Sequence, residues 1–224
     1  WGAGADRQLT GDAVFASIRS WNKKAERTGQ RRGVFWEDMG DLFEDRPELV
    51  ERRLRAFEAM EAAPMLDHML LTKRPENVWG MVPASWCADE GWPSWVWAGA
   101  TIEDGQAAFS RMPYVANWSA NGVTTFVSAE PLLGDLLAAA PSFDLIDLLI
   151  VGGESGPGAR LLDLTATEAL VRACDGFGTA VFMKQLGSRW ASANPGELRK
   201  GASHGQDPYR WPAWARRREL PVSP

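Results

Sequence analysis

The segment LIVGGESGPGAR, residues 149–160, joins a glycine-rich turn to groups that can bind or react. An apolar run, Leu145 to Val151, enters the turn, and Glu154, Ser155 and Arg160 lie in it or beside it. Its glycines are Gly152, Gly153, Gly156 and Gly158. Glycine tolerates positive φ and has no side chain, so the turn could bring backbone N–H groups close to a ligand. An ordinary glycine-rich turn between a strand and a helix remains open. The spacing fits neither GxGxxG nor the P-loop, so neither route to nucleotide binding is indicated.

Polar side chains also follow five other apolar stretches, each at the point where a predicted strand ends. They are Asp41 after 33–36, Lys73 and Arg74 after 69–72, Glu103 after 95–101, Glu130 after 123–128, and Lys184 and Gln185 after 180–183. In parallel β/α folds the carboxyl ends of all strands lie on one face, where ligands bind. We therefore expect these side chains to gather around one binding site.

Several kinds of chemistry are open at such a face. Lys73 or Lys184 could form a Schiff base if desolvated, although each could equally be a counter-ion for a nearby carboxylate. Glu37, Asp38 and Asp41 could hold magnesium, but a solvated acidic loop is the simpler interpretation. These residues keep a conventional lyase or hydrolase among the candidates.

Other sites are excluded or disfavoured. Only two histidines occur, and His68 lies at the start of a strand, on the face opposite the expected site, so a histidine-ligated metal barrel is disfavoured. The sequence has no GxSxG elbow and no CxxC pair. Cys174, four residues after Leu170 on a predicted helix, is interpreted as core packing.

The elements that must position the site are strands alternating with helices. Helices are predicted over 12–27, with an apolar face that includes Trp21, and after Asp45, with Val50, Leu54 and Phe57 inside. A capping box of Thr165 and Glu168 predicts a helix ending at Gly176 or Gly178. Six strands of this kind favour a parallel sheet, either doubly wound or a β/α barrel. Because charge follows all six ends, we predict a complete or partial β/α barrel in preference to a doubly wound sheet.

Length and composition indicate one large domain. The chain has 224 residues and a net charge of −5, which disfavours a generally basic nucleic-acid surface. The basic run Arg216–Arg218 is interpreted as a solvated face. No apolar stretch of about 18 residues and no signal peptide are present, so we expect a cytoplasmic protein without a membrane partner. Residues 1–187 form the predicted barrel domain and 188–224 an irregular tail rich in Trp, Arg and Pro, whose tryptophans are expected to cover the barrel's surface.

Five motifs together resemble a family of phage and prophage proteins of unknown function. They are DLFEDRPEL (41–49), LLTKRPENVW (70–79), SAEPLLG (128–134), LIVGGESGPGAR (149–160) and FMKQLG (182–187). Their order and spacing also match, from Trp1 to about Gly187. Complete members look like radical-SAM proteins, with a first strand and a three-cysteine motif before the equivalent of Trp1. The resemblance therefore implies a radical-SAM type of partial barrel, a [4Fe–4S] cluster and S-adenosylmethionine.

The sequence departs from the family in lacking the three-cysteine motif, and Ala129 stands where relatives often have cysteine. The start at Trp1, directly before the first helix, favours a chain whose first strand is missing. Three functions stay open. The first is a radical-SAM enzyme of unknown substrate, if the cysteines lie upstream, and the second is a clusterless barrel that binds a nucleotide or nucleic-acid end for a phage or defence partner. The third is the conventional lyase or hydrolase.

The expected roles of the site residues follow from their position at strand ends. Catalytic roles are expected for Lys73, Glu130 and Lys184. Contacts to S-adenosylmethionine are expected for Glu103, Gly152, Gly153, Glu154 and Ser155. Contacts to the substrate are expected for Asp41, Arg74, Arg160 and Gln185. An anionic substrate would be held by the cations Lys73, Arg74, Arg160 and Lys184.

Overall fold

The computed structural model describes residues 12–36, 40–88, 91–194 and 204–221, and the structural statements concern these residues. Six strands form one sheet in the order β1-β2-β3-β4-β5-β6, and every neighbouring pair is parallel. The strands are β1 (Arg32–Trp36), β2 (Leu66–Thr72), β3 (Val96–Thr101), β4 (Thr125–Ala129), β5 (Leu148–Gly152) and β6 (Ala180–Gln185). The sequential order of neighbouring strands is that of a barrel and differs from a doubly wound sheet.

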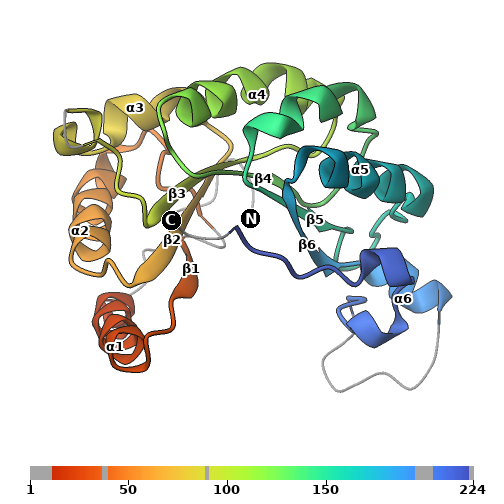
Figure 1. Cartoon of the computed structure of the whole chain (residues 1–224), viewed down its shortest axis with the longest axis horizontal. Coiled ribbons are helices and arrows are strands. Elements are labelled where there is room, and N and C mark those ends of the chain that lie inside the picture. The colour runs from red at the N-terminus through yellow and green to blue at the C-terminus, as the bar shows by residue number, and fades with distance from the viewer. Residues whose placement is uncertain (1–11, 37–39, 89–90, 195–203, 222–224) are drawn as a thin grey trace.

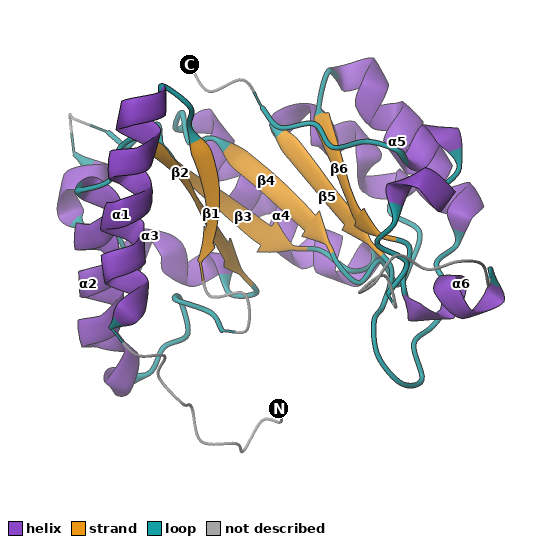
Figure 2. Ribbon diagram, turned by 90° about the horizontal axis from the view of Figure 1, so that it is seen from below, coloured by secondary structure: helices purple, strands orange, loops and turns teal. Residues whose placement is uncertain are grey.

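Helices connect the strands and lie along the outer side of the sheet. They are α1 (Ala13–Thr28), α2 (Val50–Glu61), α3 (Val78–Met81), α4 (Gly105–Ala120), α5 (Leu164–Phe177) and α6 (Ser188–Ala193). Short 3-10 helices are η1 (Pro47–Leu49), η2 (Pro75–Asn77), η3 (Ala84–Cys87), η4 (Leu137–Leu145), η5 (Pro208–Arg210) and η6 (Ala213–Ala215). In Figure 1 the strands form an arc with α2 to α5 outside it, and Figure 2 looks into the concave side. The fold is a parallel β/α half-barrel, which confirms the predicted partial barrel.

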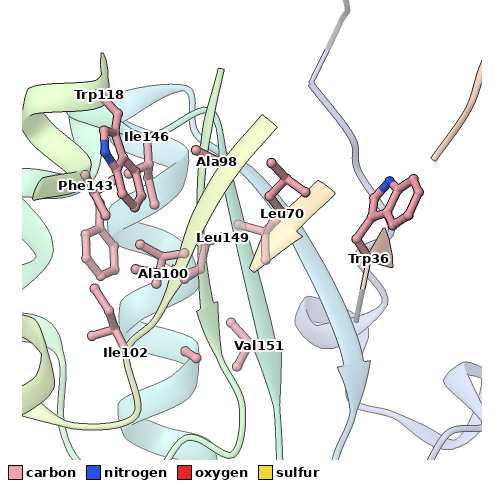
Figure 3. Close-up of a cluster of buried hydrophobic side chains, with 14 of the residues drawn as sticks. Trp36, Leu70, Ala98, Ala100, Ile102, Trp118, Phe143, Ile146, Leu149 and Val151 are labelled. Atoms are coloured by element: carbon pink, nitrogen blue, oxygen red, sulfur yellow. The ribbon is translucent and has the colours of Figure 1, made fainter. Parts of the chain in front are cut away.

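Alternation along the strands divides their side chains between two faces. On the outer side, Leu70, Ala98 and Leu149 join the main core with Trp118 of α4 and Phe143 of η4 (Figure 3). The concave side carries a second apolar cluster, which we call the floor: Met69, Trp97, Phe126, Leu148 and Ile150, with Leu71, Ala180 and Phe182 against it. Burial on both faces explains why these strands lack polar alternation in their bodies.

The chain after β6 returns to the sheet. The Met183 N–H donates to the Arg217 carbonyl at 3.0 Å, and the Glu219 N–H donates to the Val181 carbonyl at 3.0 Å. Phe182 and Arg218 form an antiparallel bridge, so this segment lies along the edge of β6 and covers it. Trp190 and Trp211 are buried and Trp214 is half-buried, which confirms that these tryptophans pack on the barrel.

Two predicted helix faces were wrong in part, although Phe57 of α2 is buried as predicted. Val50 and Leu54 of α2 are 45% and 54% exposed, while Arg53 is buried. Arg53 takes the inner position because its Nη1 donates to the carbonyls of Leu42 and Glu44, at 2.9 and 3.4 Å. Hydrophobicity alone cannot predict that a polar side chain is buried because it donates hydrogen bonds to the carbonyls of a neighbouring loop.

The same cause places Asn22 inside α1 and leaves Trp21 43% exposed. The Asn22 Oδ1 accepts from the Met65 N–H at 2.9 Å and ties α1 to the start of β2.

The predicted helix starts also need correction. Asp163, and not Thr165, caps α5, because its carboxylate accepts from the N–H groups of Thr165 and Ala166 at 2.9 and 3.0 Å. The predicted stop at Gly178 is confirmed, since Gly178 has φ 75°. Asp45 caps no helix, because η1 begins after Arg46.

Candidate functional site

The carboxyl ends of the strands carry the predicted site residues, as expected for a parallel sheet. We call this set the rim: Asp41, Lys73, Arg74, Glu103, Glu130, Glu154, Ser155, Arg160, Lys184 and Gln185. Glu37 and Asp38 lie outside the described residues. The rim residues fall into four separate groups of contacts, which differ in how firmly each charge is held.

The first group joins the β1–α2 loop to the end of β2. Asp41 accepts hydrogen bonds from the Thr72 hydroxyl at 2.8 Å and from the Lys73 N–H at 3.1 Å, and pairs with Arg74 at 2.8 Å. Glu44 lies 3.3 Å from Arg74 and 3.1 Å from Arg46. Asp41 is thus surrounded by protein donors, and its contacts fix the loop on the sheet.

The second group joins the ends of β2 and β3. Lys73 Nζ lies 2.5 Å from Glu103 Oε1, and Arg111 of α4 lies 2.8 Å from Glu103 Oε2. Burial would raise the pKa of Glu103, but the hydrogen bond and charge of Lys73 and the charge of Arg111 outweigh it and lower this pKa. Glu103 is therefore a carboxylate enclosed by two cations.

The third group spans three strands on the concave side. Glu130 Oε2, just past β4, lies 3.4 Å from Lys184 Nζ on β6, and the Ser128 hydroxyl donates to Glu130 at 3.5 Å. Gly152 of β5 lies between them: a Cβ there would be 2.4 Å from Glu130 Oε1. The glycine is needed so that the carboxylate can cross β5 and reach the lysine.

A β-bulge places Lys184 in this group. Val151 pairs with Met183 but Gly152 pairs with Gln185, so Lys184 is the extra residue of β6. Bulges re-aim side chains and are over-represented next to active sites. The Lys184 side chain is 51% exposed and Glu130 only 16%, so an open cation faces an enclosed anion above the apolar floor.

The fourth group lies within the turn after β5. Arg160 donates to Glu154 with Nε at 2.9 Å, with Nη2 at 2.8 Å and with its backbone N–H at 2.8 Å. These side-chain and backbone hydrogen bonds lower the pKa of Glu154 to about 2. Ser155 is exposed, and its hydroxyl has no hydrogen bond within the residues that the structure describes.

Gly153 and Gln185, which were predicted to contact a ligand, make contacts within the protein instead. A Cβ on Gly153 would lie 2.4 Å from the Leu186 carbonyl oxygen, so this glycine lets the turn pack on the loop after β6. The Gln185 amide donates to the Gly153 carbonyl at 3.0 Å from a buried position. The glycine-rich turn of the sequence is therefore explained first by close packing between two loops.

Two residues of these groups had no predicted role in the site: Ser128, which the sequence places at a strand end, and Arg111. Ser128 follows Phe126 by two positions, so strand alternation places its hydroxyl on the concave side, above the floor. That alternation was a usable signal. Arg111 lies in the middle of a helix, and nothing in the sequence connects it to Glu103.

An apolar hollow of about 420 Å³ lies elsewhere, between α4 and η4. Phe109, Met112 and Leu145 line it, with Asp135 as a carboxylate at its wall. It includes no rim residue and carries no group with evident chemistry.

The chain matches a family described as "Protein of unknown function (DUF5131)" over residues 4–212. The chain belongs to this family. The match includes every residue of the rim and ends before the segment that covers β6. No curated protein matches the chain.

A solved structure that is similar to this chain is that of an enolase protein from the environmental genome shotgun sequencing of the Sargasso Sea. It is 12% identical with a TM-score of 0.45, and the alignment covers 76% of this chain and 45% of that chain. The chain therefore spans less than half the length of that enolase protein. No helix in the described part of the chain has both the length and the hydrophobicity needed to span a membrane.

Proposed function

We propose that the rim binds S-adenosylmethionine and that the chain is the barrel part of a radical-SAM-type enzyme, as the resemblance implies. The same resemblance suggests a phage or prophage setting and a phage or defence partner protein, and the sequence composition suggests a cytoplasmic location. The substrate would be a small anionic or nucleotide-like molecule that meets the cations of the rim.

The observation that carries this proposal is the Glu130–Lys184 pair above Gly152. The methionine part of the cofactor has an α-ammonium and an α-carboxylate, so it needs an anion and a cation a few ångströms apart. Glu130 and Lys184 supply these charges 3.4 Å apart. In this proposal the ammonium replaces Lys184 as the partner of Glu130, and Lys184 turns to the carboxylate. The exposed Ser155 hydroxyl is available for the ribose.

The residues of this chain do not fit an iron–sulfur cluster. Only two cysteines occur, and Cys87 is exposed on η3 while Cys174 is buried in α5. Burial raises the pKa of Cys174 to about 12, which opposes the thiolate that a metal requires. No group of three His, Cys, Asp or Glu side chains among the described residues could hold a metal ion. No reaction step through a cluster is therefore assigned.

An amine-dependent lyase receives little support from the two lysines. The side chains of Lys73 and Lys184 are 55% and 51% exposed, and each pairs with a carboxylate. An amine becomes a good nucleophile when it is desolvated. Both lysines are better suited to bind a charged ligand.

Calorimetric titration with S-adenosylmethionine tests the proposal. We expect saturable binding to the chain, and Kd raised at least tenfold by Lys184→Ala and by Glu130→Gln, because each removes one charge-assisted contact worth about 1.5 kcal/mol or more. Arg172→Ala removes a cation from an exposed pair on α5 and should leave Kd unchanged.

Parallel titrations with methionine and ATP distinguish the two proposed functions, a barrel that binds S-adenosylmethionine and a clusterless barrel that binds a nucleotide. Binding of ATP but not of S-adenosylmethionine would favour the clusterless nucleotide-binding barrel. Equal Kd values for the two rim variants and the Arg172 control would show that the ligand binds elsewhere.

A further inference from the structure

The charges of the chain are unevenly distributed, and the positive part is its C-terminal lobe. We use this name for residues 188–194 and 204–221, which include α6, η5 and η6. These residues contain five arginines and two carboxylates, whereas the whole chain has a net charge of −5. The arginines are Arg189, Arg210, Arg216, Arg217 and Arg218. Charge asymmetry of this kind indicates an anionic partner for the positive part.

The lobe differs from the rim in how its cations are compensated. Every lysine and arginine of the rim has a carboxylate within 3.4 Å. In the lobe only Arg217 has such pairs, with Asp175 and Glu219. The other four arginines form no ion pair with any carboxylate that the structure describes. No carboxylate in the described part of the chain therefore cancels their positive charge, although partial burial lowers the pKa of Arg218.

Three of these four guanidinium groups, those of Arg210, Arg216 and Arg218, are nevertheless held in place. Arg216 donates to the carbonyls of Trp211 and Tyr209, at 3.0 and 3.1 Å. Arg210 donates to the Asn194 carbonyl and lies 5.9 Å from the centre of the Trp190 ring. Arg218 lies over two rings, 4.7 Å from Phe182 and 5.3 Å from Trp211. Carbonyl and aromatic contacts fix a guanidinium and leave its charge uncancelled.

An aromatic ring accompanies the arginines on the surface. Tyr209 is 71% exposed and lies between Pro208 and Arg210 in η5. Positioned arginines beside an exposed aromatic ring suit a single nucleic-acid strand, because guanidinium groups bind phosphates while rings stack on bases. An acidic protein could also pair with these charges, but positioned guanidinium groups together with an exposed ring match the alternation of phosphates and bases along a strand, so the nucleic acid is favoured.

The lobe adjoins the turn that forms one wall of the rim. The Ser188 N–H donates to the Glu154 carbonyl at 2.9 Å, and the Ser188 hydroxyl accepts from the Gly156 N–H at 3.0 Å. The Gly187 N–H donates to the His204 carbonyl at 3.0 Å. Arg189 therefore follows directly on the residue that joins the lobe to the glycine-rich turn. A strand bound to the lobe would reach the mouth of the half-barrel at this point.

We infer that the C-terminal lobe binds a single strand of nucleic acid through Arg189, Arg210, Arg216 and Arg218, with Tyr209 stacking on a base. This inference is independent of cofactor binding at the rim.

Fluorescence anisotropy with a labelled 15-nucleotide single strand, in RNA and DNA forms, tests it. Four phosphate contacts give a slope of about −3 for log K against log salt concentration, or roughly fifty-fold weaker binding at 200 than at 50 mM salt. The Arg189→Gln/Arg216→Gln double variant should halve the slope to about −1.4. The control, Arg19→Gln/Arg172→Gln, removes two exposed arginines from α1 and α5 and should retain the full slope.

Arg216→Lys distinguishes a folding defect from the loss of a phosphate contact. This variant keeps the positive charge but loses the two hydrogen bonds to the carbonyls of Trp211 and Tyr209. It should therefore keep the salt slope if the charge of residue 216 is what binds the phosphate. The inference is overturned if the wild-type chain shows no binding at 50 mM salt, or if both double variants weaken binding equally. It is also overturned if polyglutamate competes as well as an unlabelled strand, because the lobe would then recognise negative charge of any kind.

Discussion

At the scale of single residues, His68 shows how a titratable side chain becomes part of the core. The Trp36 Nε1–H donates to His68 Nδ1 at 2.9 Å, so Nε2 carries the proton and donates to the Ala63 carbonyl at 3.1 Å. Burial lowers the pKa of His68 to about 4, although the Ala63 carbonyl and Asp67 act against this shift. The side chain is therefore neutral and structural, and the sequence prediction that it lies away from the site agrees with this role.

His68 should make the fold less stable as the pH is lowered. The unfolded chain binds a proton on this residue near pH 6.5, and the folded chain only near pH 4, so the unfolded state is favoured as the pH falls through this window. We expect the free energy of unfolding in urea to fall by about 2 kcal/mol between pH 7.5 and pH 5. His68→Gln should be less stable at pH 7.5 but should lack this dependence. An equal pH dependence in both proteins would show that His68 does not cause it.

The sequence identified most rim residues because strand ends are visible in it, but it could not give their partners. Arg111 reaches Glu103 from a helix, and Arg53 and Asn22 are polar residues at inner helix positions. Each is placed by a contact with a loop or strand outside its own helix. Hydrophobic periodicity contains no information about such contacts.

At the scale of elements, the strands combine an apolar floor with a polar rim. On β4, Phe126 belongs to the floor, and the same alternation brings Ser128 and then Glu130 to the concave side. All six strands could be predicted because their apolar bodies and charged ends are local features. The bulge that contains Lys184 could not, since register depends on pairing with β5.

The floor also explains a glycine within a strand. A Cβ on Gly99 would lie 2.4 Å from the Phe126 ring, so Gly99→Ala should overpack the concave side and destabilise the protein by about 1–3 kcal/mol. Gly105 has open space at its Cβ position, and Gly105→Ala should leave stability unchanged or slightly higher. Urea unfolding measures both variants.

A double-mutant cycle isolates the clash. In a Phe126→Ala background the ring is gone, so Gly99→Ala should cost much less than in the wild-type chain. The same cost in both backgrounds would mean that the glycine is needed for another reason.

At the scale of the whole molecule, the half-barrel gathers the carboxyl ends of its parallel strands at one rim. Its parallel architecture could be predicted from alternating strands and helices. The position of the C-terminal lobe could not, because Arg217 and Glu219 pair with β6 through backbone contacts that have no sequence signature. A charge of −5 for the chain also concealed the positive lobe.

A crystal structure of the chain with S-adenosylhomocysteine would test the central claim most directly, because this ligand keeps the amino-acid group of the cofactor. We expect its ammonium within hydrogen-bond distance of Glu130 and its carboxylate on Lys184, above Gly152. A ligand bound away from the rim, with the Glu130–Lys184 pair unchanged, would contradict it.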